Sequence, residues 1–281
     1  MQVYVSVDME GIAGVVHVDQ TRRTGHDYER ARRWMTLEAN AAVLGAFDAG
    51  ARAVLVNDSH GDMRNLLIEE LDPRAEILSG SLKPRSMVEG VAAQFQVALF
   101  VGYHAGAGSR AGVLDHTYYG KVVQRCRLGH DGVPLREVNE ALLNAIVCGM
   151  YDVPVGMVTG DSTTCAQTRE LLGDIVTVQV KEAITRYAAR SASPEHARAK
   201  IREGARHAVQ RAAARELRPY RPAPPHVLEI DFVNSACADA AELVPGTRRV
   251  SGTATRYDAP DGEVLLKVIQ AWTILAGSTV V

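Results

Sequence analysis

The sequence predicts an α/β fold: a mostly parallel sheet with helices on both faces, plus a smaller C-terminal α+β portion. Short runs rich in valine, alanine and leucine alternate with longer segments whose apolar residues recur at helical spacing. This alternation is typical of strands joined by crossover helices. After about residue 190, a charged, alanine-rich segment and a proline-rich connector interrupt it. We therefore expect a larger unit, residues 1–190, and a smaller unit, residues 191–281.

The larger unit is expected to contain strands at residues 2–7, 53–56, 97–101, 155–159 and 176–180. Helices are expected at residues 28–49 and 135–150, where apolar side chains recur every three or four positions. Gly50 ends the first of these patterns, as glycine commonly does at a helix C-terminus. Strands separated by helices in this way favour parallel pairing.

The smaller unit begins with a helix expected at residues 194–218, which a proline-rich connector ends. Strands are expected at residues 228–232 and 248–255, and a closing helix at residues 262–276. Glutamates are interleaved with the arginines of residues 186–218, so this stretch predicts a solvated helix face rather than a nucleic-acid site.

Composition excludes several classes of partner. The 281 residues carry a formal net charge of −2, so no basic excess favours binding to nucleic acid or anionic lipid. The start of the chain lacks the features of a signal peptide, and no apolar run is long enough to span a bilayer. Four scattered cysteines without a C-x-x-C pair favour a reduced, cytoplasmic setting.

Polar side chains follow three of the expected strands at the point where each strand ends. Asp8 and Glu10 follow the first strand, His60 follows the second and His104 follows the third. The carboxyl ends of parallel strands share one edge of a sheet, and ligands bind in the crevice there. We therefore expect these four side chains to converge in space.

The residue types at this edge favour a metal site. Asp8 and Glu10 are two positions apart, so extended backbone would point both carboxylates to the same side. Two facing carboxylates repel each other unless a cation lies between them, and His60 and His104 add neutral nitrogen ligands. Zinc accepts this mixture of ligands. With one further carboxylate, the set would suit two ions about 3.5–4 Å apart.

Several motifs occur in order along the chain: Ser-Val-Asp-Met-Glu-Gly-Ile from residue 6, Val-Asn-Asp-Ser-His from residue 56, Ser-Met-Val-Glu-Gly from residue 86 and Leu-Phe-Val-Gly-Tyr-His-Ala from residue 99. Together they resemble the D-aminopeptidase family of di-zinc metallopeptidases, typified by the dipeptide-transport-operon protein of Bacillus. Residues 151–161 and 180–186 extend the match. The resemblance covers nearly the whole chain and is weakest at residues 190–221.

The resemblance implies a ligand set for two zinc ions per subunit, held by the larger unit. Asp8 would bridge the two ions. Glu10 and His104 would complete the coordination of the first ion, and His60 would bind the second.

A glutamate of the expected helix at residues 135–150 would be the fifth ligand, but the pattern alone does not choose between Glu137 and Glu140. The family's glutamate lies four residues before the asparagine of a Leu-Asn-Ala segment, which selects Glu140. The family's catalytic histidine, which follows a Gly-Val pair, corresponds to His116. The chain departs from the family pattern at Asp115 and in the loop of residues 106–111, which we expect to line the substrate pocket.

The resemblance also implies an activity: release of the N-terminal residue from short peptides, with a preference for D-residues such as D-Ala, by attack of a metal-activated water. His116 would stabilise the tetrahedral oxyanion, and Glu10 is the candidate for moving a proton to the leaving amine. Family members form ring-shaped decamers, which would keep folded proteins away from the site.

Three alternatives stay open on the sequence alone. An L-selective aminopeptidase of the same family would carry the same ligands, because the pocket walls decide which hand is bound. A creatininase-like di-metal amidohydrolase would open a small or cyclic amide instead. A non-catalytic protein would use the same side chains to hold a structural or sensory metal.

Overall fold

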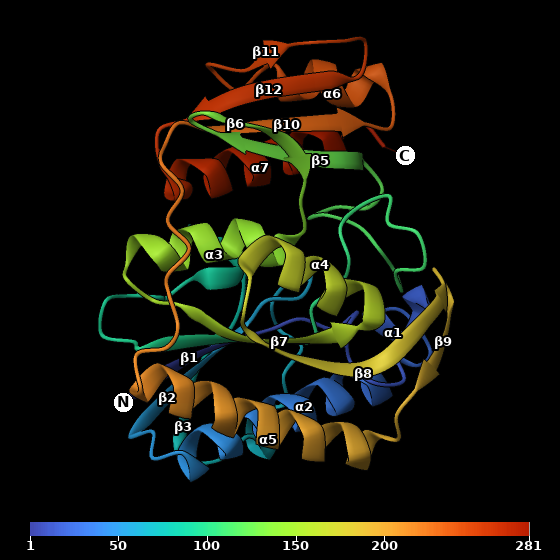
Figure 1. Ribbon diagram of the computed structural model, residues 1–281. Helices are drawn as coiled ribbons and strands as arrows, with labels where there is room; N and C mark the ends of the chain where they lie inside the picture. The colour runs from blue at the N-terminus through green and yellow to red at the C-terminus, as the bar shows by residue number, and fades with distance from the viewer. Residues whose placement is uncertain (281) are drawn as a thin grey trace.

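A seven-stranded sheet forms the larger part of the computed structural model, which describes residues 1–280 (Figure 1). The strand order is β3-β2-β1-β4-β7-β8-β9, and all neighbours are parallel except β8 and β9. The strands are β1 (Gln2–Val7), β2 (Ala53–Asp58), β3 (Ala75–Leu78), β4 (Val97–Val101), β7 (Val155–Asp161), β8 (Val176–Thr185) and β9 (Ala188–Ser191).

The strands at the centre of this sheet end at one level. β1 lies between β2 and β4, and Val7 is in register with Asp58 on one side and Val101 on the other. Because the three strands are parallel, the residues that follow them emerge together at one edge of the sheet.

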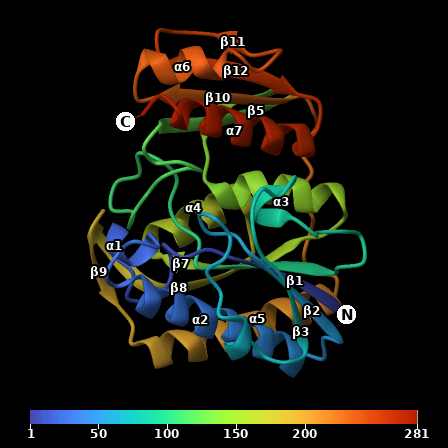
Figure 2. The same cartoon turned by 180° about the vertical axis from the view of Figure 1, so that it is seen from behind.

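Helices cover both faces of the large sheet (Figure 2). On one face, α2 and α5 pack together over Val3, Val5 and Val7 of β1. Tyr4 points to the opposite face, where α3 and α4 lie. The helices of this part of the chain are α1 (Val18–Thr21), α2 (Tyr28–Asp48), α3 (Glu140–Met150), α4 (Ser162–Leu172) and α5 (Pro194–Ala213), with short 3-10 turns η1 (Ile68–Glu70) and η2 (Ser86–Val88). Within residues 1–280, none of the helices combines the length and apolarity needed to cross a membrane.

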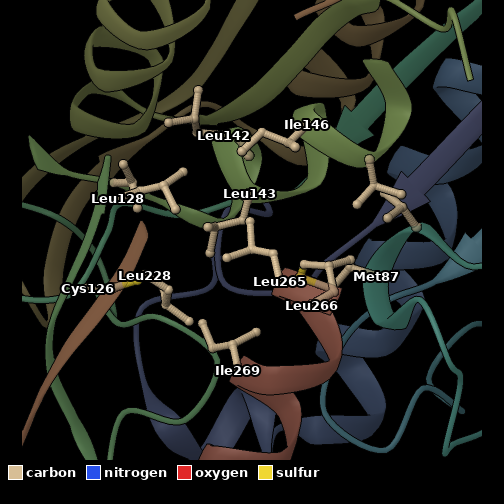
Figure 3. Close-up of a cluster of buried hydrophobic side chains, with 14 of the residues drawn as sticks. Met87, Cys126, Leu128, Leu142, Leu143, Ile146, Leu228, Leu265, Leu266 and Ile269 are labelled. Atoms are coloured by element: carbon tan, nitrogen blue, oxygen red, sulfur yellow. The ribbon is translucent and has the colours of Figure 1, made fainter. Parts of the chain in front are cut away.

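A five-stranded antiparallel sheet forms the second part, in the order β11-β12-β10-β5-β6. Its elements are β5 (Val123–His130), β6 (Val133–Glu137), β10 (His226–Phe232), β11 (Arg248–Arg249), β12 (Ala254–Ala259), α6 (Ser235–Ala241) and α7 (Gly262–Gly277). Leu265 and Ile269 of α7 share a buried cluster with Leu143 and Ile146 of α3 (Figure 3). Burial of these apolar side chains joins the two sheets through one core.

The predicted α/β class, with a mostly parallel sheet, helices on both faces and a smaller α+β portion, is confirmed. Three expected elements differ from the structure. The helix expected at residues 135–150 begins at Glu140, because residues 133–137 form β6 and Asn139 caps the helix through its side chain. The strand expected at residues 248–255 is two short strands, β11 and β12, and the helix expected at residues 194–218 ends at Ala213.

The expected boundary near residue 190 falls within the last residues of β9, shortly before α5. α5 follows this boundary and packs with α2 on the large sheet, whereas the β5–β6 hairpin precedes it and pairs with β10 in the second sheet. The division into residues 1–190 and 191–281 stays a prediction about independent folding, and separate expression of the two pieces would test it.

Candidate metal centre

The candidate site lies at the carboxyl edge of β2, β1 and β4. Asp8 follows β1 directly, and His60 and His104 lie in the loops after β2 and β4. Two glycines let these loops touch: Gly102 has a φ of +71°, and a Cβ on Gly11 would lie 1.9 Å from a carbonyl oxygen of the β4 loop. Instead, the amide of Gly11 donates a 2.8 Å hydrogen bond to the carbonyl of Gly102. The structure thus brings together the side chains that the sequence places at this edge.

Asp8 lies at the centre of the cluster. Its Oδ1 is 3.1 Å from Nδ1 of His60, and its Oδ2 is 3.3 Å from Nε2 of His104. Oε2 of Glu10 lies 3.0 Å from the same nitrogen of His60, and Oε2 of Glu140 lies 3.6 Å from the same nitrogen of His104. All five residues are at most 9% exposed, so water offers little screening between them.

Main-chain carbonyl groups orient each histidine of the site. Nε2 of His60 lies 2.8 Å from its carbonyl partner, Nδ1 of His104 lies 3.0 Å from its own, and Nδ1 of His116 lies 2.8 Å from its own. The partners are the carbonyls of Thr21, Ala105 and Leu114, respectively. A nitrogen that donates to a carbonyl leaves the other nitrogen unprotonated in neutral imidazole, as in metal-ligating histidines.

Glu140 reaches the cluster from the first turn of α3. Its Oε1 accepts a 2.6 Å hydrogen bond from the amide of Tyr118, which fixes the direction of the carboxylate. The ring of His116 stacks on that of His104 with a centroid distance of 4.0 Å, and its ligand atom lies within 4.8 Å of those of Glu140 and His104. Glu137, the competing glutamate, lies on β6 with an exposed side chain.

Tyr118 is a residue of the site that the sequence does not single out. Its main-chain amide, not its side chain, holds Glu140, and its φ of +58° is unusual for a residue with a side chain. A contact made by the main chain leaves no mark in the residue type, so no motif could have revealed it.

Burial and mutual charge shift the protonation of this cluster. Burial together with the negative charge of Glu10 raises the pKa of Asp8 to about 6. Burial opposes the charged form of His60, but the carboxylates of Glu10 and Asp8 outweigh it and raise the His60 pKa well above its usual value. Burial likewise opposes ionisation of Glu10, but His60 lowers the Glu10 pKa well below its usual value. A positive charge is therefore stabilised at this point of the structure.

The donor atoms of the cluster fit zinc. Within residues 1–280, three buried atoms there have no hydrogen-bond partner: Oδ2 of Asp8, Oε2 of Glu10 and Nε2 of His104. Each unpaired buried group costs about 1–3 kcal/mol or more, so a partner is missing from the protein itself. The 3.3 Å between Oδ2 of Asp8 and Nε2 of His104 matches two ligands bound at about 2.0–2.1 Å to one tetrahedral ion.

A cavity of about 530 Å³ opens above the cluster. Basic side chains line this cavity, namely Arg22, Lys83, Lys121 and Arg186, together with apolar side chains such as Leu82 and Ile274. The loop of residues 106–111, which we expected to line this cavity, instead lines a separate pocket beside β6 and α4. Asp115 holds this loop by accepting hydrogen bonds from the amides of Gly108 and Ser109, and a contact between the loop and the substrate stays a prediction.

Comparison with known proteins places the chain in a family. A family model described as Peptidase_M55, D-aminopeptidase, matches residues 1–271. The chain is similar to a D-aminopeptidase of Bacillus subtilis (strain 168), with 41% identity over 279 residues that span 98% of this chain and 96% of the relative. It is also similar to the solved structure of the Zn-dependent D-aminopeptidase DppA from Bacillus subtilis, described as a self-compartmentalizing protease. That match has a TM-score of 0.94 at 39% identity and covers 100% of both chains. The chain therefore belongs to the M55 peptidase family of D-aminopeptidases, which confirms the resemblance that its motifs indicate.

Proposed function

We propose that this chain is a zinc-dependent aminopeptidase that releases an N-terminal D-residue, such as D-Ala, from short peptides. One observation carries the proposal: in a chain of this family, three buried ligand atoms without partners meet at the carboxyl edge of the large sheet. The cavity of about 530 Å³ above them lies in the size range of small-ligand pockets, which suits a short peptide and not a folded protein.

The proposed site holds two zinc ions per subunit, with Asp8 shared between them. Support comes from the two oxygens of Asp8, which face His60 and His104 separately. Asp8, Glu10 and His104 offer ligand atoms within 4.8 Å of one another and would hold the first ion, while His60 would bind the second. Glu140, whose Oε2 lies 3.6 Å from Nε2 of His104, would be the fifth ligand. Bound zinc would supply Lewis acidity and make a water molecule more acidic.

His116 is proposed as the catalytic residue. Its Nδ1 pairs with the carbonyl of Leu114, which leaves Nε2 for the substrate. A protonated Nε2 would donate a hydrogen bond to the oxyanion that forms when the peptide carbonyl is attacked. Glu10 is proposed to pass a proton to the leaving amine, because its carboxylate lies in the cluster that borders the cavity.

We also propose a ring-shaped decamer that works in the cytoplasm. The description of the solved relative as self-compartmentalizing supports an assembly that limits access to the site. The cysteines of this chain are buried free thiols, which suits a reducing compartment. The mass of the particle in solution, measured by light scattering, tests the size of the assembly.

The activity is tested by hydrolysis of paired D-Ala and L-Ala p-nitroanilides by the wild-type protein and by His60→Ala. We expect cleavage of the D-substrate, little cleavage of the L-substrate, and loss of activity in the variant together with part of its zinc. His196→Ala is the matched control, because His196 is exposed on α5 and is distant in sequence from all the proposed zinc ligands.

Each other outcome has a definite meaning. Preference for the L-substrate would keep the zinc chemistry and overturn the stereochemistry. Cleavage of neither substrate by a zinc-loaded protein would overturn the peptidase, and hydrolysis of small cyclic amides would then identify an amidohydrolase.

A further inference from the structure

Lys181 on β8 is a buried lysine that the proposed mechanism does not use. Lys181 is only 2% exposed and is among the largest buried side chains of the protein. It lies in the motif of residues 180–186, to which the sequence assigns no role. A buried ammonium group is costly unless all its N–H groups find acceptors, so its partners indicate its purpose.

The partners of Lys181 are main-chain carbonyls of one short segment. Nζ donates to the carbonyl of Glu10, to that of Ile12 at 2.9 Å and to that of Val15 at 2.6 Å. These contacts use all three N–H groups of an ammonium. Within residues 1–280, no carboxylate is in ion-pair contact with Lys181, so carbonyl dipoles make its direct contacts, while the charges of Asp161, Glu38 and Glu10 act on it from a greater distance.

The segment of residues 8–15 needs such a support. It contains no helix or strand, so few of its main-chain groups are held by a regular hydrogen-bond pattern. On its other side, Oε1 of Glu38 on α2 accepts a 2.9 Å hydrogen bond from the amide of Ala13. The segment that carries Glu10 is thus fixed between β8 and α2.

We propose that Lys181 is a positioning residue that holds the carboxylate of Glu10 in place for zinc by binding the main chain of residues 10–15. The proposal rests on the zinc site described under the proposed function. Lys181 does not line the cavity, so it acts on the metal through Glu10 and not through the substrate. Without its ammonium, the carbonyls of Glu10, Ile12 and Val15 lose a shared donor, and the main chain of residues 10–15 can move away from Asp8.

Lys181→Met tests this role, because methionine keeps the length of the side chain and removes the donors. We expect a folded protein, by circular dichroism, with an affinity for zinc at least 10-fold weaker in competition with a chromogenic chelator. The visible spectrum of the Co²⁺-substituted protein should change, since it reports ligand geometry. With saturating zinc, kcat should fall while KM for the peptide changes less than twofold.

Leu228→Ala is the matched control. Leu228 is fully buried on β10, so this variant loses stability without touching the metal loops. It should keep wild-type zinc affinity and the wild-type Co²⁺ spectrum. Should Lys181→Met fail to fold, Lys181→Gln carries the same comparison, because its amide still donates two hydrogen bonds and should give an intermediate zinc affinity.

The results separate this inference from the proposed function. Wild-type zinc affinity and an unchanged Co²⁺ spectrum in the folded Lys181 variant would overturn the positioning role alone. A wild-type protein that binds no zinc would overturn the zinc site, and the inference with it.

Discussion

At the scale of single residues, the site depends on which ring nitrogen of each histidine is available to bind a metal ion. Nδ1 of His60 faces the carboxylates, whereas Nε2 does so in His104, because different ring nitrogens are held by main-chain carbonyls. The residue type supplies an imidazole, but the local backbone selects the nitrogen that binds.

His116→Ala should separate catalysis from metal binding. We expect kcat to fall by roughly 100- to 1000-fold, the usual effect of removing one oxyanion donor or proton donor, while zinc per chain stays at the wild-type value. Steady-state kinetics beside elemental analysis measure both. Loss of one zinc ion would instead make His116 a ligand, an arrangement that its spacing to Glu140 also allows.

Glu38 should make stability depend on pH. Burial raises its pKa from 4.5 to about 7, so the folded state holds a proton that the unfolded state has released between these values. The free energy of unfolding therefore decreases as pH rises from about 4.5 to 7, and this contribution of Glu38 does not change further above pH 7. Glu38→Gln does not titrate, so its stability relative to wild type should rise by about 2–3 kcal/mol between pH 5 and pH 8.

Urea denaturation at both pH values measures this difference. Glu29→Gln is the control on the same helix, because the Glu29 side chain is 76% exposed, and its stability relative to wild type should be the same at both pH values. An equal effect of Glu38→Gln at pH 5 and pH 8 would show that Glu38 is ionised in the folded protein like a surface glutamate.

At the scale of elements, the close approach of the β1 and β4 loops positions Asp8 and His104. Gly102 has a φ of +71°, and a Cβ there would lie 2.2 Å from the carbonyl oxygen of Asp8. Gly102→Ala should therefore push the loops apart and lower zinc content and kcat at least 10-fold. Gly50→Ala is the matched control: its φ is +86°, but no atom lies within 4 Å of the new Cβ.

Both glycine variants should lose about 1 kcal/mol of stability from the unfavourable φ, and only Gly102→Ala should lose zinc. Urea denaturation and elemental analysis test the two statements separately. Full zinc content and activity in Gly102→Ala would contradict the role of this contact.

Strands and helices of the large sheet were predictable because their pattern is local. The apolar run at residues 97–101 and the periodic helix at residues 28–49 match β4 and α2 to within one residue. The β5–β6 hairpin was not predictable, because β5 has exposed residues beside buried ones and its partner, β10, lies far along the chain. Residues 135–137 continue the apolar period of α3 in sequence, yet pairing with β5 draws them into β6.

The site was predictable to the extent that it follows from strand ends. Asp8, His60 and His104 follow adjacent parallel strands, so a general rule of α/β sheets brings them together. Glu140 required the family resemblance, since the sequence pattern placed it and Glu137 on one helix. The contribution of Lys181 lies in side-chain contacts to main-chain carbonyls, which no sequence pattern specifies.

At the scale of the whole molecule, α7 completes the cavity that the loops of the large sheet begin. Gln270, Thr273 and Ile274 of α7 line the cavity opposite the loops of the large sheet. The metal cluster lies in the large sheet, and the core shared by α3 and α7 joins it to that wall (Figure 3). A change in the metal cluster should therefore alter the stability of the entire fold.

Removal of the metal should lower the thermal stability of the whole chain. Without a cation, the buried carboxylates of Asp8, Glu10 and Glu140 face one another, and binding of zinc to the folded state alone stabilises it. We expect dialysis against a chelator to lower Tm by roughly 10 °C and added zinc, but not magnesium, to restore it. Calorimetry measures both steps, and an unchanged Tm after metal removal would contradict a buried zinc cluster.

Anomalous scattering from crystals of the protein, recorded on both sides of the zinc absorption edge, tests the two-zinc site directly. We expect two zinc peaks per chain with the carboxylate of Asp8 between them, His104 against one and His60 against the other. A single peak, or peaks that do not contact Asp8, would contradict the two-zinc site on which the proposed peptidase depends.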